Sequence, residues 1–155
     1  MAYRTAWRIL GHVQDTEDAV QEAFLEVLRA VRQEEVKNAG GLVRRVVAWR
    51  ALDRLRQRRR AEQISEEISA PAAEQPSRVL EARESAERLR ALLCELPDRP
   101  AEVFSLRYFG EMSNPEIAAA LNVSVESVAV ALYKARSALA AKWNRPATAM
   151  RSPQP

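Results

Sequence analysis

The sequence is poor in the residues that build disulfides, metal centres and membrane spans. Its single cysteine, Cys94, excludes an internal disulfide, and its single histidine, His12, cannot hold a metal ion alone. No apolar run approaches the roughly 18 residues of a membrane span, and no signal-peptide pattern opens the chain. We therefore expect a cytoplasmic protein without a cofactor, a metal or a catalytic site. Because Cys94 lies among leucines, we expect a buried thiol rather than a redox sensor.

Glycine and aromatic residues are also scarce. The 155 residues include four glycines and 6% aromatics, while 47% are hydrophobic. This composition favours helices over a sheet and predicts an all-α fold. From about Ala61 to Ser77, acids, alanines and two prolines indicate a flexible linker. We predict two small helical domains at 1–62 and 79–143, a linker at 63–78 and a disordered tail at 144–155.

A helix-turn-helix pattern occupies the second predicted domain. Ser113 or the residue after it can cap a helix whose first turn contains Pro115. Asn122 tolerates the left-handed conformation of a tight turn, and Ser124 can cap the next helix. In this motif the second helix enters the major groove of DNA. An αα-hairpin of ordinary packing would show much of the same pattern.

An amphipathic helix is predicted to begin at Asp15 or Thr16. Its acidic and amide side chains form either a solvated face or a docking surface for a basic partner, and both interpretations stay open. The predicted core face consists of Val20, Ala23, Phe24, Val27, Leu28 and Val31. The predicted polar face consists of Asp18, Gln21, Glu22 and Glu26.

The next predicted helix, Leu42 to Arg58, is rich in arginine. Helical spacing places Arg45, Trp49, Leu52 and Arg56 on one face, where a ring for a base and charges for the backbone suit a single-stranded nucleic acid. Arginines so close together would repel one another without a polyanion. The alternative is a solvated basic helix with Trp49 partly in the core. The arginines are Arg44, Arg45, Arg50, Arg54, Arg56, Arg58, Arg59 and Arg60, against one acid, Asp53.

Three segments in order resemble one family. Asp15 to Phe24, D-T-E-D-A-V-Q-E-A-F, is similar to the stretch by which sigma-70 factors dock on the clamp helices of RNA polymerase. Val46 to Arg60 resembles the segment that melts and reads the minus-ten promoter element, and 96–136 resembles the module that binds the minus-thirty-five element. The chain is identified as a member of the extracytoplasmic-function (ECF) sigma-70 type.

The resemblance implies a non-enzymatic subunit that directs promoter recognition and transcription initiation. The implied partners are core RNA polymerase, promoter DNA in duplex and single-stranded form, and, as in many relatives, an anti-sigma factor; the free protein would be a monomer without a membrane partner. Implied polymerase-docking residues are Asp15, Asp18, Gln21 and Glu22. Implied minus-ten residues are Arg45, Trp49, Arg50, Asp53, Arg54 and Arg56. Implied minus-thirty-five residues are Ser124, Glu126, Ser127, Lys134 and Arg136.

The chain departs from the family pattern in several places, and three departures bear on its expected extent and on DNA contact. A further helix usually precedes the one that starts near Tyr3, so either a missing leading segment or a misplaced start is expected. Trp49 stands where asparagine is frequent, which favours stacking over hydrogen bonding to a base. Ala129, Val130 and Ala131 replace a frequent lysine, serine and arginine, which predicts weaker upstream recognition. Two rival classes are a stand-alone helix-turn-helix regulator and a helical adaptor without a DNA role.

Overall fold

The computed structural model describes residues 1–33, 36, 38–64 and 77–144, and these ranges are helical with no strand. The all-α prediction is therefore confirmed. The predicted tail from 145 onward and linker residues 65–76 lie outside the described residues. The helices are α1 (Ala2–Leu10), α2 (Val13–Gln33), α3 (Ala39–Ile64), α4 (Ser77–Cys94), α5 (Asp98–Tyr108), α6 (Asn114–Leu121) and α7 (Val125–Trp143).

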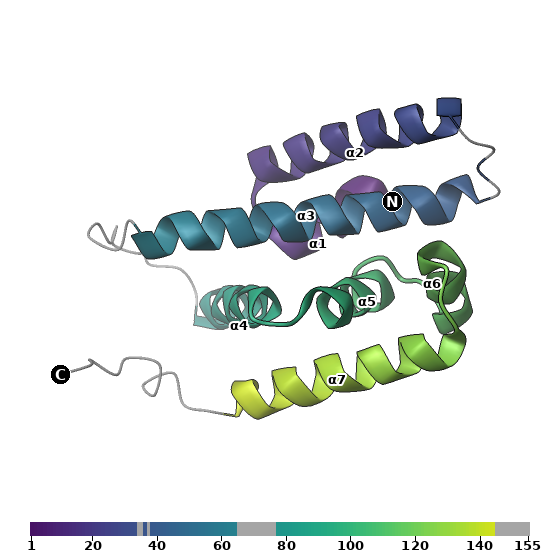
Figure 1. Ribbon diagram of the computed structural model, residues 1–155. Coiled ribbons are helices and arrows are strands. Elements are labelled where there is room, and N and C mark those ends of the chain that lie inside the picture. The colour runs from purple at the N-terminus through teal and green to yellow at the C-terminus, as the bar shows by residue number, and fades with distance from the viewer. Residues whose placement is uncertain (34–35, 37, 65–76, 145–155) are drawn as a thin grey trace.

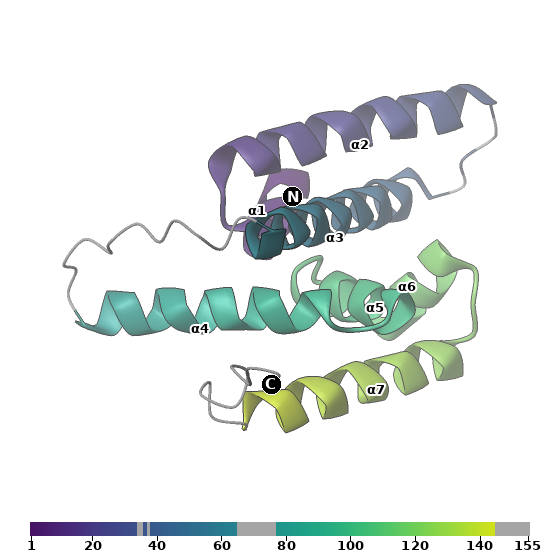
Figure 2. The same cartoon turned by 60° about the vertical axis from the view of Figure 1, so that its left-hand side comes forward.

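The long helix α3 lies at the centre of the molecule. It packs against α1 and α2 on one side and against α4, α5 and α6 on the other. Figure 1 shows the resulting layers, with α2 above α3, α4 and α5 below it, and α7 furthest from α2. The turned view in Figure 2 shows the same order, so the two helical modules lie directly against each other.

Helix α2 buries a narrower face than its sequence predicts. The predicted core residues Ala23 and Val27 are buried, together with Thr16 and Ala19. The predicted core residues Phe24, Leu28 and Val31 are instead about half exposed, so this part of the prediction is wrong. The small side chains of the buried face let α2 approach α3 closely, and the bulkier apolar residues then fall on the outer surface.

Helix α3 extends beyond the predicted Leu42 to Arg58 at both ends. It begins at Ala39 and continues to Ile64, into the first residues of the predicted linker. Residues on several of its sides are buried, as expected for a helix that packs against helices on opposite sides. Its buried residues are Gly41, Val46, Val47, Ala48, Ala51, Leu52 and Leu55.

The helix-turn-helix is formed by α6 and α7. The Ser113 hydroxyl accepts a hydrogen bond from the Glu116 amide, and Glu116 reaches back to the Ser113 amide, which makes a capping box. Asn122 ends α6 with φ 52°, and Ser124 caps α7. The two helix axes bend by 107°, within the about 90–120° typical of this motif. This geometry distinguishes the motif from an antiparallel αα-hairpin.

The length and hydropathy of the helices can be compared with what a membrane span requires. Within the described ranges no single helix is long and apolar enough to cross a membrane; α6 and α7 together meet that test by length and composition only.

Cys94 is half-buried rather than buried, and burial raises the pKa of its thiol. It lines a hollow of about 540 Å³ with Arg56, Arg59 and Arg60.

Candidate nucleic-acid interface

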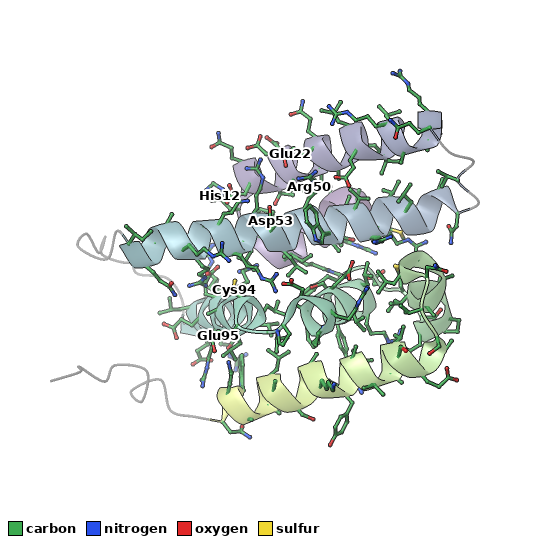
Figure 3. The ribbon with its side chains drawn as sticks, in the orientation of Figure 1. His12, Glu22, Arg50, Asp53, Cys94 and Glu95 are labelled. Carbon is green, nitrogen blue, oxygen red and sulfur yellow. The ribbon has the colours of Figure 1, made fainter. Side chains whose placement is uncertain are left out.

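The arginines of α3 that face α2 are joined to carboxylates of α2. The Arg54 guanidinium lies 3.1 Å from Asp18 and 2.5 Å from Glu22. Arg58 lies 3.1 Å from Asp15. Arg50 pairs with Glu26 at 2.7 Å. Figure 3 shows Glu22 and Arg50 in the space between α2 and α3.

This ladder of ion pairs links two sets of residues that the sequence assigned to different partners. Asp15, Asp18 and Glu22 were expected to face polymerase, and Arg50 and Arg54 to face DNA. In this structure each of them has its nearest opposite charge on the neighbouring helix. The expectation that the arginines need an external polyanion is therefore wrong, since the chain supplies counter-charges of its own.

A second set of α3 arginines faces α5 and α6. Arg56 lies 2.5 Å from Asp98 and donates to the Leu96 carbonyl at 3.0 Å. Arg45 donates to the Ala120 carbonyl at 3.3 Å, and its Nε lies 3.8 Å from Glu102. With Arg44 near Glu116 and Arg59 near Glu87, seven of the eight arginines have a carboxylate within ion-pair distance. Of these eight, Arg60 alone has no carboxylate partner among the described residues.

Trp49 lies between the two arginine sets. Its side chain is 47% exposed, and the Arg50 guanidinium sits 4.9 Å from the ring centroid. Arg45, Trp49, Leu52 and Arg56 line one hollow of about 380 Å³, which confirms that they share a face. The same hollow is closed on its far side by Asp98, Arg99 and Glu102 of α5. The face predicted to hold single-stranded DNA is thus in contact with the other module.

The Glu102 carboxylate of α5 lies within ion-pair distance of both Arg45 of α3 and Arg99 of α5. Burial raises the pKa of its carboxyl above the ordinary 4.5, although Arg99 and Arg45 oppose the shift. Arg99 holds the carboxylate at 3.0 Å. A buried carboxylate between arginines favours a closed arrangement only while those cations remain its partners.

The outward face of α7 is almost free of internal contacts. Its core side contains Val128, Ala131, Leu132, Ala135 and Leu139, and the opposite side is exposed. The residues predicted to contact the upstream element differ in their internal hydrogen bonds and ion pairs. Ser124 and Ser127 bond to each other through the helix cap, and Arg136 donates to the Tyr108 hydroxyl at 2.6 Å. Glu126 and Lys134 have no ion-pair partner in the part of the chain that the structure describes.

Several residues of interest were missed from the sequence. The sequence analysis gave no role to Asp98 and Glu102, although they meet the arginines of α3. The exposed apolar residues Phe24, Leu28 and Val31 of α2 were predicted to be core. The spacing of Thr16, Ala19, Ala23 and Val27 carried the correct signal, since small residues at helical spacing mark a close helix contact.

Comparison with known protein families matches the two modules to two regions of the same family. The Sigma-70 region 2 family matches residues 1–61. The Sigma-70, region 4 family matches residues 86–139. The first match contains the arginine-rich α3 up to its last turn, and the second contains the helix-turn-helix.

Two known proteins are similar to this chain over most of its length. The ECF RNA polymerase sigma factor SigE of Mycolicibacterium smegmatis is 29% identical over 141 residues, covering 88% of this chain and 55% of SigE. The ECF RNA polymerase sigma factor SigW of Bacillus subtilis is 24% identical over 149 residues, covering 88% of this chain and 80% of SigW. The chain thus spans about half the length of SigE. With regions 2 and 4 matched in order, the chain belongs to the ECF group of the sigma-70 family.

Proposed function

We propose that this protein is a sigma factor that binds core RNA polymerase, directs it to promoters and supports DNA opening at transcription initiation. The observation that carries the proposal is the Trp49 face of α3, on which an exposed ring lies beside the Arg50 guanidinium and shares a hollow with Arg45 and Arg56. A stand-alone duplex binder has no use for such a face. Its presence in one chain with a helix-turn-helix fits a protein that holds both duplex and separated DNA.

Core polymerase would bind the outer side of α2. The docking acids Asp18 and Glu22 remain nearly half exposed while they pair with Arg54, so they can contact a basic partner from the outer side. Beside them lie Gln21 and the exposed apolar residues Phe24 and Leu28. An interface of this kind, apolar at its centre and acidic at its edge, is typical of specific protein contacts.

Strand capture would require an exchange of anions. Arg45 and Arg56 would leave Glu102 and Asp98 and bind DNA phosphates, and a base would stack on Trp49. Stacking of this type contributes about 1–3 kcal/mol per base. The exchange separates α5 from α3, so the two modules would move apart when the protein engages polymerase and promoter.

The polymerase would supply the nucleotide chemistry, so the chain needs no catalytic group of its own. The protein would act in the cytoplasm, where the polymerase transcribes. An anti-sigma factor that covers α2 or the Trp49 face would keep it inactive.

Reconstitution with core polymerase tests the proposal. The purified chain should co-elute with the core enzyme and give promoter-dependent transcripts from genomic DNA fragments. Trp49→Ala should reduce transcripts and strand opening while duplex binding and co-elution persist. Trp143→Ala is a matched control, because that ring is similarly exposed and also lies beside an arginine, Arg88, at 4.9 Å. DNA binding without polymerase binding would instead indicate a stand-alone regulator.

A further inference from the structure

The recognition helix α7 has an unusual surface for its position. Its first half, residues 125–133, contains no lysine, arginine or histidine. The most frequent base contact of such helices, a bidentate arginine or lysine on guanine, is therefore not available there. Any sequence preference of this first half must therefore come from other chemistry.

The exposed face of this half is apolar. Val130 is 53% exposed and Tyr133 is 72% exposed, and Ala129 lies beside them. Helical spacing places these three residues, the α7 apolar patch, together with Glu126 on the side opposite the buried Val128 and Leu132. Residues at these positions of a recognition helix are the ones that reach base edges.

At Val130 the patch borders a hollow whose lining includes two cations. Val130 lines a hollow of about 400 Å³ together with Pro100, Ala131 and Glu126, and the cations Arg99 and Lys134 also line it. Apolar side chains next to cations suit a groove that presents both base edges and phosphates. Ser124 and Ser127 are occupied by the helix cap, which leaves the patch and Glu126 facing the bases.

The apolar feature of the major groove is the C5-methyl group of thymine, and the donor that a carboxylate accepts is the N4 amino group of cytosine. We propose that the α7 apolar patch reads thymine methyl groups and that Glu126 reads a neighbouring cytosine. This inference rests on the proposed function of α7 as the upstream promoter contact. It makes the upstream element of this chain thymine-dependent rather than guanine-dependent.

Replacing thymine with deoxyuridine, which lacks only the methyl group, tests this directly. Duplexes with a randomised segment of about 20 base pairs, two helical turns, are selected by the full chain, with and without core polymerase. The enriched duplex is then synthesised with thymine or deoxyuridine in the segment. We expect about fourfold weaker binding for each contacted thymine that loses its methyl group.

Val130→Ala should weaken binding to the thymine duplex by a similar factor and leave binding to the deoxyuridine duplex unchanged. Val79→Ala is the matched control, because Val79 is an exposed valine on α4, far along the chain from the recognition helix. Glu126→Gln should broaden the base preference at one cytosine position. The thymine-to-deoxyuridine comparison uses the unaltered protein, so it holds even if a variant folds poorly.

Equal affinity for both duplexes would overturn the inference, as would enrichment confined to guanine positions or no enrichment at all. The same protein preparation is tested for co-elution with polymerase and for transcripts. Methyl-dependent binding without polymerase binding would reject the proposed function and keep the methyl contact. Transcripts with no methyl dependence would reject the methyl contact and keep the proposed function.

Discussion

The two surfaces assigned to DNA differ in nearly every physical respect. The Trp49 face of α3 is rich in arginine, and its charges are satisfied by Asp98 and Glu102 of the other module. The outward face of α7 has little charge and is open to solvent. The difference teaches that charge density does not by itself mark the surface that is ready to bind DNA. Under the proposed function, the arginine-rich face would first have to exchange its partners, whereas the neutral face would bind at once but with little attraction for phosphates.

The largest loss of stability is expected on removing an α3 arginine whose ion pairs hold α2 against α3. Arg54→Ala removes the cation that three α2 carboxylates share, Asp15, Asp18 and Glu22. Because the cluster is partly buried, we expect a loss of about 2 kcal/mol in the free energy of unfolding, measured by urea denaturation. Arg60→Ala is the control and should change stability by less than about 0.5 kcal/mol. Equal stability of the two variants would show that Arg54 is available for DNA after all.

The open face depends on the caps that shape the helix-turn-helix. Ser124→Ala removes the side chain that accepts from the Ser127 amide at 3.1 Å. We expect a loss of about 1 kcal/mol of stability, seen in thermal unfolding, and weaker duplex binding. Binding of single-stranded DNA should not change, because α3 has no part in this cap. A parallel loss of single-strand binding would mean that the two faces do not act independently.

Removing the acids of α5 should uncover the α3 face. In the double variant Asp98→Asn and Glu102→Gln, Arg45 and Arg56 lose their carboxylate partners. We expect affinity for single-stranded DNA to rise about threefold in a fluorescence titration. The rise is small because partly exposed ion pairs contribute little free energy. Duplex affinity should stay constant. Glu95→Gln is the control, since Glu95 pairs with Lys142 on α7. An unchanged single-strand affinity would show that the acids do not compete with DNA.

The smallest expected effect is a pH dependence. The pKa of Glu102 is raised from 4.5 by burial, so its ionised form opposes folding at neutral pH and this penalty is relieved as the pH falls through the raised pKa. Glu102→Gln should therefore be slightly more stable than the unaltered protein at neutral pH. The gap should narrow as the pH falls toward the raised pKa. A gap that widens on acidification would mean that the arginines, not burial, dominate this carboxylate.

The sequence predicted the elements of this fold well because their signals are local. The capping residues Ser113 and Ser124 and the left-handed Asn122 are chosen by the chemistry of a few neighbouring backbone groups. Such preferences need no knowledge of the rest of the molecule. The helix-turn-helix was therefore predictable in detail.

The partners of the charged residues could not be predicted in the same way. An arginine such as Arg54 or Arg56 looks the same in sequence whether it meets DNA, solvent or a carboxylate of another helix. Its partner depends on contacts between residues far apart in the chain, for example 42 positions for Arg56 and Asp98. The error on α2 has a similar origin. Periodicity finds an apolar face, but which part of it is buried depends on how closely α3 can approach.

The most direct test of this comparison is the distance between the modules before and after assembly. Spin labels at Gln57→Cys on α3 and Ser137→Cys on α7, both at exposed positions, would be measured in a Cys94→Ser background. We predict one short, narrow distance distribution in the free protein and a longer one once core polymerase and promoter DNA are bound. A distance that stays short in a transcriptionally active complex would contradict the claim that the Trp49 face must be uncovered to act.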